Sequence, residues 1–392
     1  MLRSALPRRL LGRALIGISA LMLGVATAAS GAGPSLPAPA ALDTAIPKAM
    51  ATVDAKGLAV AIVDGGKVVY VRSFGQRNQQ AEPLRTDTVM SAASLTKPLF
   101  AYAVLQLADE GKIDLDASIA SYLKEPLPSY PTLRPYAAWR DLEGDERWKK
   151  ITPRILLSHR AGFANFQGLE SDRKLHIHFE PGTRYAYSGD GINLLQFVLE
   201  RGLGLDITAE LQRRVFERFG MQHTSMIWQQ HAAENQADGY NNRGSPLPHL
   251  QRKRVAAASS MDTTIDDYAR FVAGLVSGDG LSAAARKDMV TAQWPITTRS
   301  QFPTLQPELP TSQRRADLAA GLGVVVFNGP QGPGFYKGGH EDNVGNVWVC
   351  LSLQQRCVVL LSIDVRAEKA FPEIVGLILG EAGVPWKWEY GL

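Results

Sequence analysis

Ser94-Leu95-Thr96-Lys97, followed at once by Pro98 and an apolar run, is the stretch of the sequence that decides the fold. A lysine three residues after a serine lies one helical turn away on the same face, where its amine can reach the hydroxyl. A serine hydroxyl needs such a base before it can act as a nucleophile. The spacing therefore predicts a serine nucleophile that requires no histidine, provided that a helix begins here.

The residues around this tetrapeptide favour a helix start. Ser94 is of a type that caps helix N-termini, and Pro98 would fall in the first turn, where its missing N–H costs little. Apolar residues recur at helical spacing from Leu99 to Ala108, and Gly111 supplies a C-terminal stop. As a bare pattern, Ser-x-x-Lys is equally well explained by a capped helix with a solvated lysine, so the rest of the chain has to decide.

The N-terminus predicts export. Four arginines (Arg3, Arg8, Arg9 and Arg13) precede an uncharged apolar segment from Ala14 to about Ala28, which ends in a small-residue site at 26–28. This segment is shorter than the roughly 20 residues of a spanning helix, so we expect a signal peptide over residues 1–28 and a Pro-rich linker over 29–42. The protein would be periplasmic or secreted by the general pathway, with no stable membrane span after signal removal.

Charge and length limit the function classes. The 392 residues are 45% hydrophobic, enough for a large core. The whole chain carries a net charge of +4 from 42 basic and 38 acidic residues, and the four signal arginines account for all of it. The mature protein is therefore nearly neutral, which argues against a nucleic-acid partner.

The two cysteines, Cys350 and Cys357, fall in an expected hairpin with a turn at 354–356. In an oxidising compartment they could form a disulfide across the two strands. Alternatively they remain two buried thiols, because strand register decides whether the sulfurs meet.

The order of expected elements predicts an α+β fold. A hairpin is expected over 58–74, helices over 152–158, 191–200, 208–219 and 264–276, strands over 322–327 and 346–363, and a terminal helix over 371–379. We therefore expect one antiparallel sheet built from both ends of the chain and flanked by helices, with a mainly helical domain inserted. The catalytic domain would span 43–392, with the sheet in about 43–90 and 318–392 and the helical part in about 91–317.

Three segments make the chain resemble the β-lactamase and penicillin-binding superfamily of serine hydrolases, in the branch of class C β-lactamases, D-Ala-D-Ala carboxypeptidases and family VIII esterases. They are Ser91-Ala92-Ala93-Ser94-Leu95-Thr96-Lys97, Ile151-Thr152-Pro153-Arg154-Ile155-Leu156-Leu157-Ser158-His159 and Pro181-Gly182-Thr183-Arg184-Tyr185-Ala186-Tyr187-Ser188-Gly189. Tyr187 follows Ser94 by 93 residues and Lys337 follows it by 243, which is how this branch spaces its three active-site elements.

The resemblance implies roles for these residues. Tyr187 matches the family tyrosine that helps to move the serine proton, with Tyr185 as the fallback. A neighbouring lysine ammonium would lower the pKa of this tyrosine, and whether Tyr187 or Lys97 takes the proton stays open.

The third family element matches Lys337-Gly338-Gly339. Lys337 would hold a substrate carboxylate, and the two glycines would let the substrate approach the strand. The oxyanion hole would use the backbone N–H groups of Ser94 and His340.

One residue departs from the family pattern. Position 189 is Gly where the family usually has Asn, whose amide would bind the substrate and the catalytic lysine. The departure weakens the case for β-lactam turnover more than the case for acyl transfer. Asp190 or Asn193 is a candidate substitute.

Other chemistries fit less well. His159 beside Ser158 is expected to be structural, because no Gly-x-Ser-x-Gly motif is present. His176 and His178 lack further residues at ligand spacing, so neither a metal nor another cofactor is expected.

The sequence thus predicts an exported serine hydrolase that forms an acyl-enzyme on Ser94 with a small-molecule or peptide substrate. β-Lactams or D-amino-acid-containing amides are the first expected substrates. A carboxylesterase is the alternative enzyme. A penicillin-recognising receptor or cell-wall-binding protein with little turnover is the alternative outside enzymes.

Overall fold

The computed structural model describes residues 35–391, so the predicted signal peptide lies outside the described residues. Its strands are β1 (Gly57–Asp64), β2 (Lys67–Gly75), β3 (Met90–Ser91), β4 (Gly239–Tyr240), β5 (Pro246–Leu247), β6 (Asp262–Thr263), β7 (Trp294–Pro295), β8 (Leu318–Ala320), β9 (Val325–Gly329), β10 (Gly332–Glu341), β11 (Val344–Leu351) and β12 (Arg356–Ser362). Its α-helices are α1 (Pro39–Thr52), α2 (Thr96–Asp109), α3 (Pro153–Leu157), α4 (Gly189–Arg201), α5 (Ile207–Leu211), α6 (Ile265–Ser277), α7 (Ala283–Met289), α8 (Phe371–Leu379) and α9 (Trp386–Tyr390). Within this part of the chain, none of the helices combines the length and apolarity needed to cross a membrane.

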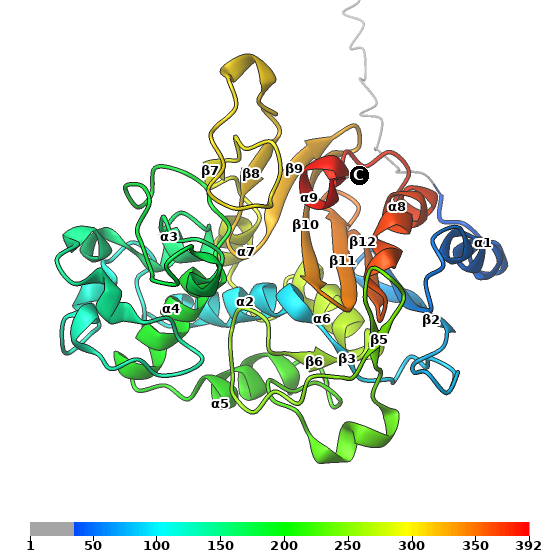
Figure 1. Cartoon of the computed structure of the whole chain (residues 1–392). Coiled ribbons are helices and arrows are strands. Elements are labelled where there is room, and N and C mark those ends of the chain that lie inside the picture. Colours follow the sequence, from blue (N-terminus) through cyan, green and yellow to red (C-terminus); the bar gives the residue numbers. More distant parts are fainter. Residues whose placement is uncertain (1–34, 392) are drawn as a thin grey trace, which may run out of the picture. The chain divides into compact units, whose positions relative to one another are not determined.

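Eight antiparallel strands form the main sheet, in the order β2-β1-β12-β11-β10-β9-β8-β7. β1 and β2 come from the N-terminal part of the chain and the other six strands from its last hundred or so residues (Figure 1). The prediction of an α+β fold with one sheet built from both chain ends is confirmed. β7 lies inside the stretch that we expected to be helical, because Trp294 and Pro295 pair with Ala320 and Ala319 at the sheet edge.

Helices cover both faces of the sheet. Alternate side chains of a strand point to opposite faces, and β1 is buried along almost its whole length. Leu58 and Val60 pack in a cluster with side chains of α1 and α8. Ala59 and Ala61 pack in a second cluster with side chains of α2 and α6. The chain thus forms a helix–sheet–helix stack, with α1 beside α8 on one side and α2 and α6 on the other (Figure 1).

The predicted linker over 29–42 ends too late. α1 begins at Pro39, so the last four residues of that stretch are helical. Proline is tolerated at the first helical position because a backbone N–H there has no partner within the helix, so the absence of one costs little. Leu42, in the first turn of this helix, is fully buried against the sheet.

Register brings the two cysteines together. In the β11–β12 hairpin, Cys350 lies directly opposite Cys357, and their sulfurs form a disulfide. Of the two alternatives that the sequence left open, the structure has the disulfide.

Candidate active site

The turn before α2 presents Ser94, but not as a helix cap. Ala93–Leu95 form a 3-10 turn, α2 begins at Thr96, and no side chain caps it, so the expected N-cap role of Ser94 is wrong. Ala93 has a φ of 48°, a left-handed conformation that costs an alanine about 1–2 kcal/mol. Thr96 Oγ1 donates to the Ala93 carbonyl at 2.7 Å and holds the turn. The Ser94 hydroxyl is consequently left for other partners.

Those partners are Lys97 and Tyr187. Lys97 Nζ lies 3.0 Å from Ser94 Oγ, and the Tyr187 hydroxyl donates to Ser94 Oγ at 2.8 Å. Lys97 comes from the first turn of α2, whereas Tyr187 lies two residues before α4. The structure therefore brings Tyr187 to the Ser94–Lys97 pair, although Tyr187 follows Ser94 by 93 residues in the sequence.

Lys97 has a second contact that the sequence did not predict. Its Nζ donates to the backbone carbonyl of Ala258 at 2.6 Å. Ala258 is held in turn, because its N–H donates to Asn193 Oδ1 at 3.2 Å. A backbone carbonyl carries no sequence signal, so only the fold could show this contact. Asn193 thus acts on Lys97 through the backbone of Ala258 rather than by replacing the family asparagine directly.

Electrostatics favour a neutral Lys97. Burial, and then the charge of Lys337, hold the pKa of Lys97 well below its usual range, while Glu341 opposes this shift. A neutral amine has a lone pair that can accept the Ser94 proton.

Tyr187 stays protonated. Burial raises the pKa of Tyr187, and the hydrogen bond with Ser94 lowers it by less. The expectation that a neighbouring ammonium lowers this pKa is therefore wrong, because burial disfavours the phenolate and the Glu389 charge raises the pKa further. The ring lies between two amines, with Lys97 Nζ and Lys337 Nζ each 4.9 Å from its centroid.

Lys337 extends from β10 beside this group. Its side chain is buried, and its Nζ donates to the Gly338 carbonyl at 2.5 Å. Burial lowers the pKa of Lys337 to about 8, and Glu389 opposes the shift. Glu389 is a buried carboxylate near the C-terminus that accepts from Tyr336 at 3.0 Å and from Gln301 at 2.9 Å. Sequence reasoning missed it, because nothing in α9 marks Glu389 as a counter-charge to a residue of β10.

The two glycines after Lys337 allow other segments of the protein to pack closely against β10. A Cβ on Gly339 would lie 2.8 Å from Ala92 O and 3.2 Å from Leu95 N, so β10 packs directly on the turn that carries Ser94. A Cβ on Gly338 would lie 2.2 Å from Glu389 Oε1. Protein atoms therefore occupy the space that a Cβ would take at either glycine, and close approach of the substrate to this strand stays a prediction.

The His340 ring pairs with Glu368 rather than with Ser94, Lys97 or Tyr187. Its Nδ1 lies 2.8 Å from Glu368 Oε1, and this hydrogen bond raises the pKa of His340. The backbone of His340 follows the point where Gly339 contacts the Ser94 turn.

Phe166 occupies the space beside Gly189. A Cβ on Gly189 would lie 2.4 Å from the ring atoms Cε1 and Cζ of Phe166. Asp190 accepts the Gln167 N–H at 2.6 Å, and burial raises its pKa to about 6. Position 189 therefore has no room for an asparagine unless Phe166 moves.

The remaining candidates have structural partners. Tyr185 donates to Gln301 Oε1 at 3.1 Å, and His159 Nδ1 accepts the Ser188 N–H at 3.2 Å. His176 Nε2 lies 2.9 Å from an Asp172 oxygen, and His178 Nε2 lies 2.6 Å from a Glu170 oxygen.

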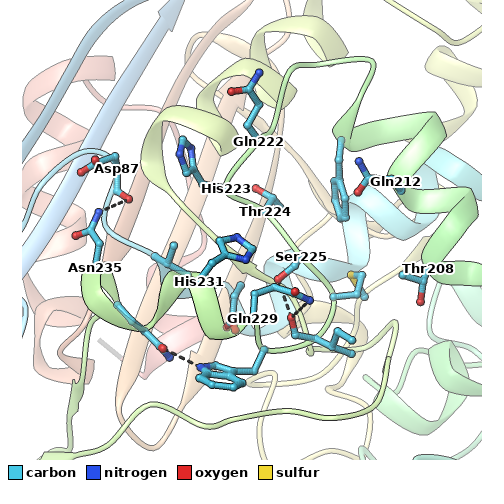
Figure 2. A pocket seen from close by; sticks show the side chains of 18 of the residues that line it. Asp87, Thr208, Gln212, Gln222, His223, Thr224, Ser225, Gln229, His231 and Asn235 are labelled. Atoms are coloured by element: carbon cyan, nitrogen blue, oxygen red, sulfur yellow. Dashed lines mark hydrogen bonds between the residues drawn. The ribbon is translucent and has the colours of Figure 1, made fainter.

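A cleft of about 640 Å³ beside β6 is lined by imidazoles, hydroxyls and side-chain amides, including His223 and His231 (Figure 2). Its lining does not include the candidate residues Ser94, Lys97, Tyr187 and Lys337. Over residues 35–391, no group of three or more His, Cys, Asp or Glu side chains is arranged to hold a metal ion.

A family model described as Beta-lactamase matches residues 42–373. The chain belongs to the beta-lactamase family. This family comprises serine hydrolases, and the cluster around Ser94 lies inside the matched region.

Individual relatives show the range of this family. Esterase EstB of Burkholderia gladioli is 27% identical over 202 residues, which cover 48% of this chain and 51% of the relative. Penicillin-binding protein 4* of Bacillus subtilis is 22% identical over 255 residues, which cover 59% of this chain and 49% of the relative. The chain thus matches about half the length of each of these two proteins.

A solved structure supports the fold alone. D-alanine carboxypeptidase AmpC from Burkholderia cenocepacia has a TM-score of 0.65 and 19% identity, and the match covers 86% of this chain and 97% of that one.

Proposed function

We propose that this chain is an exported serine hydrolase that forms an acyl-enzyme on Ser94, and that its substrates are carboxylic esters. The observation that carries the proposal is the position of Ser94 Oγ between Lys97 Nζ at 3.0 Å and the Tyr187 hydroxyl at 2.8 Å. The lowered pKa of Lys97 supports a neutral amine that can accept the Ser94 proton, and the raised pKa of Tyr187 supports a hydroxyl that keeps its proton and donates to Oγ.

In the acylation step, Lys97 is the base. Neutral Lys97 accepts the Ser94 proton while Oγ bonds to the acyl carbon. The Tyr187 hydroxyl is hydrogen-bonded to Oγ before the reaction. It passes a proton from the resulting Lys97 ammonium to the departing alkoxide. Water then attacks the acyl carbon and gives a proton to Lys97. As the bond to Ser94 Oγ breaks, the Lys97 ammonium returns this proton to Oγ, which releases the acid and restores Ser94 and neutral Lys97.

The oxyanion would lie between β10 and the Ser94 turn. The backbone N–H groups of Ser94 and His340 are the proposed donors. The close packing of Gly339 on Ala92 and Leu95 supports this assignment, because it holds the two backbone segments together.

Phe166 favours esters over β-lactams. Its ring fills the space in which the resemblance would place an amide-recognising asparagine. An ester has no amide N–H to bind, so the loss of this group costs ester hydrolysis less. Lovastatin esterase of Penicillium rubens and EstB are relatives named for ester hydrolysis.

Lys337 supports a second candidate, the hydrolysis of D-amino-acid-containing peptides. A buried ammonium beside Tyr187 is suited to holding the terminal carboxylate of such a peptide. A β-lactamase of Pseudomonas fluorescens is also among the relatives, at 25% identity over 242 residues.

One experiment separates these functions. The mature protein is incubated with p-nitrophenyl butyrate, a chromogenic cephalosporin and a D-Ala-D-Ala peptide, and the intact mass is read in parallel. We expect fastest turnover of the ester. A stable adduct without turnover would instead support the receptor alternative.

Variants assign the nucleophile. Ser94→Ala should lose hydrolysis and adduct formation by a factor of at least about 10³, whereas the exposed Ser129→Ala should not. Full activity in Ser94→Ala would overturn the proposal.

Export is tested separately. The sequence of residues 1–28 and the Cys350–Cys357 disulfide support an oxidising compartment. After expression in a Gram-negative host, we expect a periplasmic protein whose intact mass corresponds to a chain that begins at Ala29. Recovery of the full-length chain from the membrane fraction would contradict export.

A further inference from the structure

A second cleft adjoins the active site. Its volume is about 720 Å³, which is within the range of ligand-binding clefts. Phe166, which packs against Gly189, lines one part of the cleft, and Ser259, which follows the Lys97 partner Ala258, lines another. Ser94, Lys97 and Tyr187 do not themselves line the cleft. It borders their surroundings at two points, through Phe166 beside Gly189 and through Ser259, the residue after Ala258.

Three cations line this cleft without a carboxylate partner among the described residues. They are Arg134, Lys253 and Arg254, and all three are exposed. Arg254 Nη1 donates to the Arg134 carbonyl at 3.1 Å, which ties the two cleft walls together. Arg252 also lines the cleft, but it is neutralised by Glu341 at 2.6 Å.

The acidic groups of this region are already engaged. Asp190 lines the cleft, but it is buried and its carboxylate accepts the Gln167 N–H. Glu200 lines an adjoining cleft of about 410 Å³ that shares Arg134 and Arg254, and it is bonded to Tyr136 and Gln196.

The local excess of positive charge is not a property of the whole protein. Without residues 1–28 the chain has 38 basic and 38 acidic residues, because the four arginines of that segment are removed from a total of 42. A cleft lined by one sign of charge concentrates ligands of the opposite sign.

We propose that this cleft binds an anionic group, a carboxylate or a phosphate, on the substrate whose acyl carbon reacts at Ser94. This inference rests on the proposed function, and it adds a second anion site to the one assigned to Lys337. The preferred substrate is then an extended acyl compound that carries acidic groups at two places. Arg134, Lys253 and Arg254 determine this preference, and they act on binding rather than on the chemical step.

The test compares a neutral and an anionic substrate of similar length. The substrates are p-nitrophenyl hexanoate and the mono-p-nitrophenyl ester of adipic acid, and the variant is the double substitution Lys253→Gln/Arg254→Gln. We expect the ratio of kcat/KM for the anionic over the neutral ester to fall at least about tenfold, through KM, at low ionic strength. Salt should shrink the difference, because exposed charges are screened.

A matched control separates a local effect from a general change of charge. Lys67→Gln/Arg243→Gln removes one exposed lysine and one exposed arginine that do not line the cleft. This variant should keep the wild-type ratio. Lys337→Gln provides a further arm: if it abolishes the whole anionic preference while the cleft variant does not change it, the cleft proposal is wrong.

Binding is also measured without turnover. Titration of Ser94→Ala with adipate and with glycerol phosphate, followed by calorimetry, distinguishes a carboxylate from a phosphate ligand. Weaker binding of at least one of them when Lys253→Gln/Arg254→Gln is added to Ser94→Ala supports the proposal, and equal binding of both ligands with and without the cleft substitutions overturns it. If the cleft substitutions leave the anionic preference unchanged while ester hydrolysis still depends on Ser94, the cleft proposal fails and the proposed function stands. If ester hydrolysis does not depend on Ser94, the proposed function fails instead.

Discussion

Arg252 and Glu341 join the two halves of the active site. Nη2 of Arg252 lies 2.6 Å from both carboxylate oxygens of Glu341, and Ser91 Oγ donates to the same carboxylate at 3.2 Å. Arg252 lies in the segment that leads to Ala258, and Glu341 ends β10. The ion pair therefore links the backbone that holds Lys97 to the strand that carries Lys337.

Glu341→Gln should move the acidic limb of the pH profile of kcat/KM to lower pH. Glu341 raises the pKa of Lys97, so its removal lowers that pKa further and keeps Lys97 neutral in more acidic solution. We expect the acidic limb to move by less than about one pH unit, since the Arg252–Glu341 pair is partly exposed to solvent. The control is Glu373→Gln on the exposed face of α8. An unchanged limb, or one that moves to higher pH, would contradict Lys97 as the base.

Lys337→Met should stabilise the protein near neutral pH while impairing binding of carboxylate substrates. The pKa of Lys337 is about 8 in the fold against 10.5 for a free lysine. Between these values the unfolded chain holds a proton that the folded protein has released, so the free energy of unfolding rises with pH. Below about pH 8 the fold carries the full cost of the buried charge, on the order of 3–4 kcal/mol.

Thermal unfolding checks this prediction. The melting temperature of Lys337→Met should exceed that of wild type near pH 7, and the gain should shrink at about pH 10. The exposed Lys369→Met should show neither effect. A lower melting temperature for Lys337→Met near pH 7 would contradict the prediction. It would show that the attraction between Lys337 and Glu389 stabilises the fold by more than burial of the Lys337 charge costs.

Gly339→Ala should destabilise the protein and lower activity. The added Cβ would meet backbone atoms of Ala92 and Leu95, which cannot move without shifting the Ser94 turn. Overpacking of this kind costs about 1–3 kcal/mol, and we expect kcat to fall more than KM rises. In contrast, a Cβ on Gly376 in α8 meets nothing within 4 Å, so Gly376→Ala should stabilise by about 0.5–1 kcal/mol. Denaturant unfolding and ester kinetics measure both, and equal effects would refute the contact argument.

Gly189→Asn should lower both stability and ester hydrolysis. The new side chain displaces the Phe166 ring, which is half-buried and can turn toward the adjoining cleft, so we expect a cost near 1 kcal/mol.

Phe166→Ala in the same chain should restore stability, because it vacates the space that the asparagine needs. If the asparagine then binds an amide as the resemblance implies, cephalosporin turnover rises relative to ester turnover. A double-mutant cycle that is additive would show that residues 166 and 189 do not compete for this space.

Much of the fold could be predicted because its elements are locally encoded. The hairpin around Gly65 and Gly66, the helix over 371–379 and the strands that carry the two cysteines all lie within a few residues of where turn and periodicity signals placed them. The start of α2 was misplaced for a specific reason. A left-handed Ala93 and a 3-10 turn are sustained by contacts from Thr96 and Met261, and no local preference of an alanine predicts them.

The sequence by itself singled out the candidate residues: Ser94 and Lys97 by their spacing, and Tyr187 and Lys337 by the family resemblance that their order and separation carry. It also raised the question of Gly189. Only the tertiary structure decided their protonation, because pKa values depend on burial and on charges brought from distant segments, such as Glu341 and Glu389. The structure likewise showed that Phe166 fills the place beside Gly189 and that three cations share one cleft, since contacts between segments far apart in the chain exist only once it has folded.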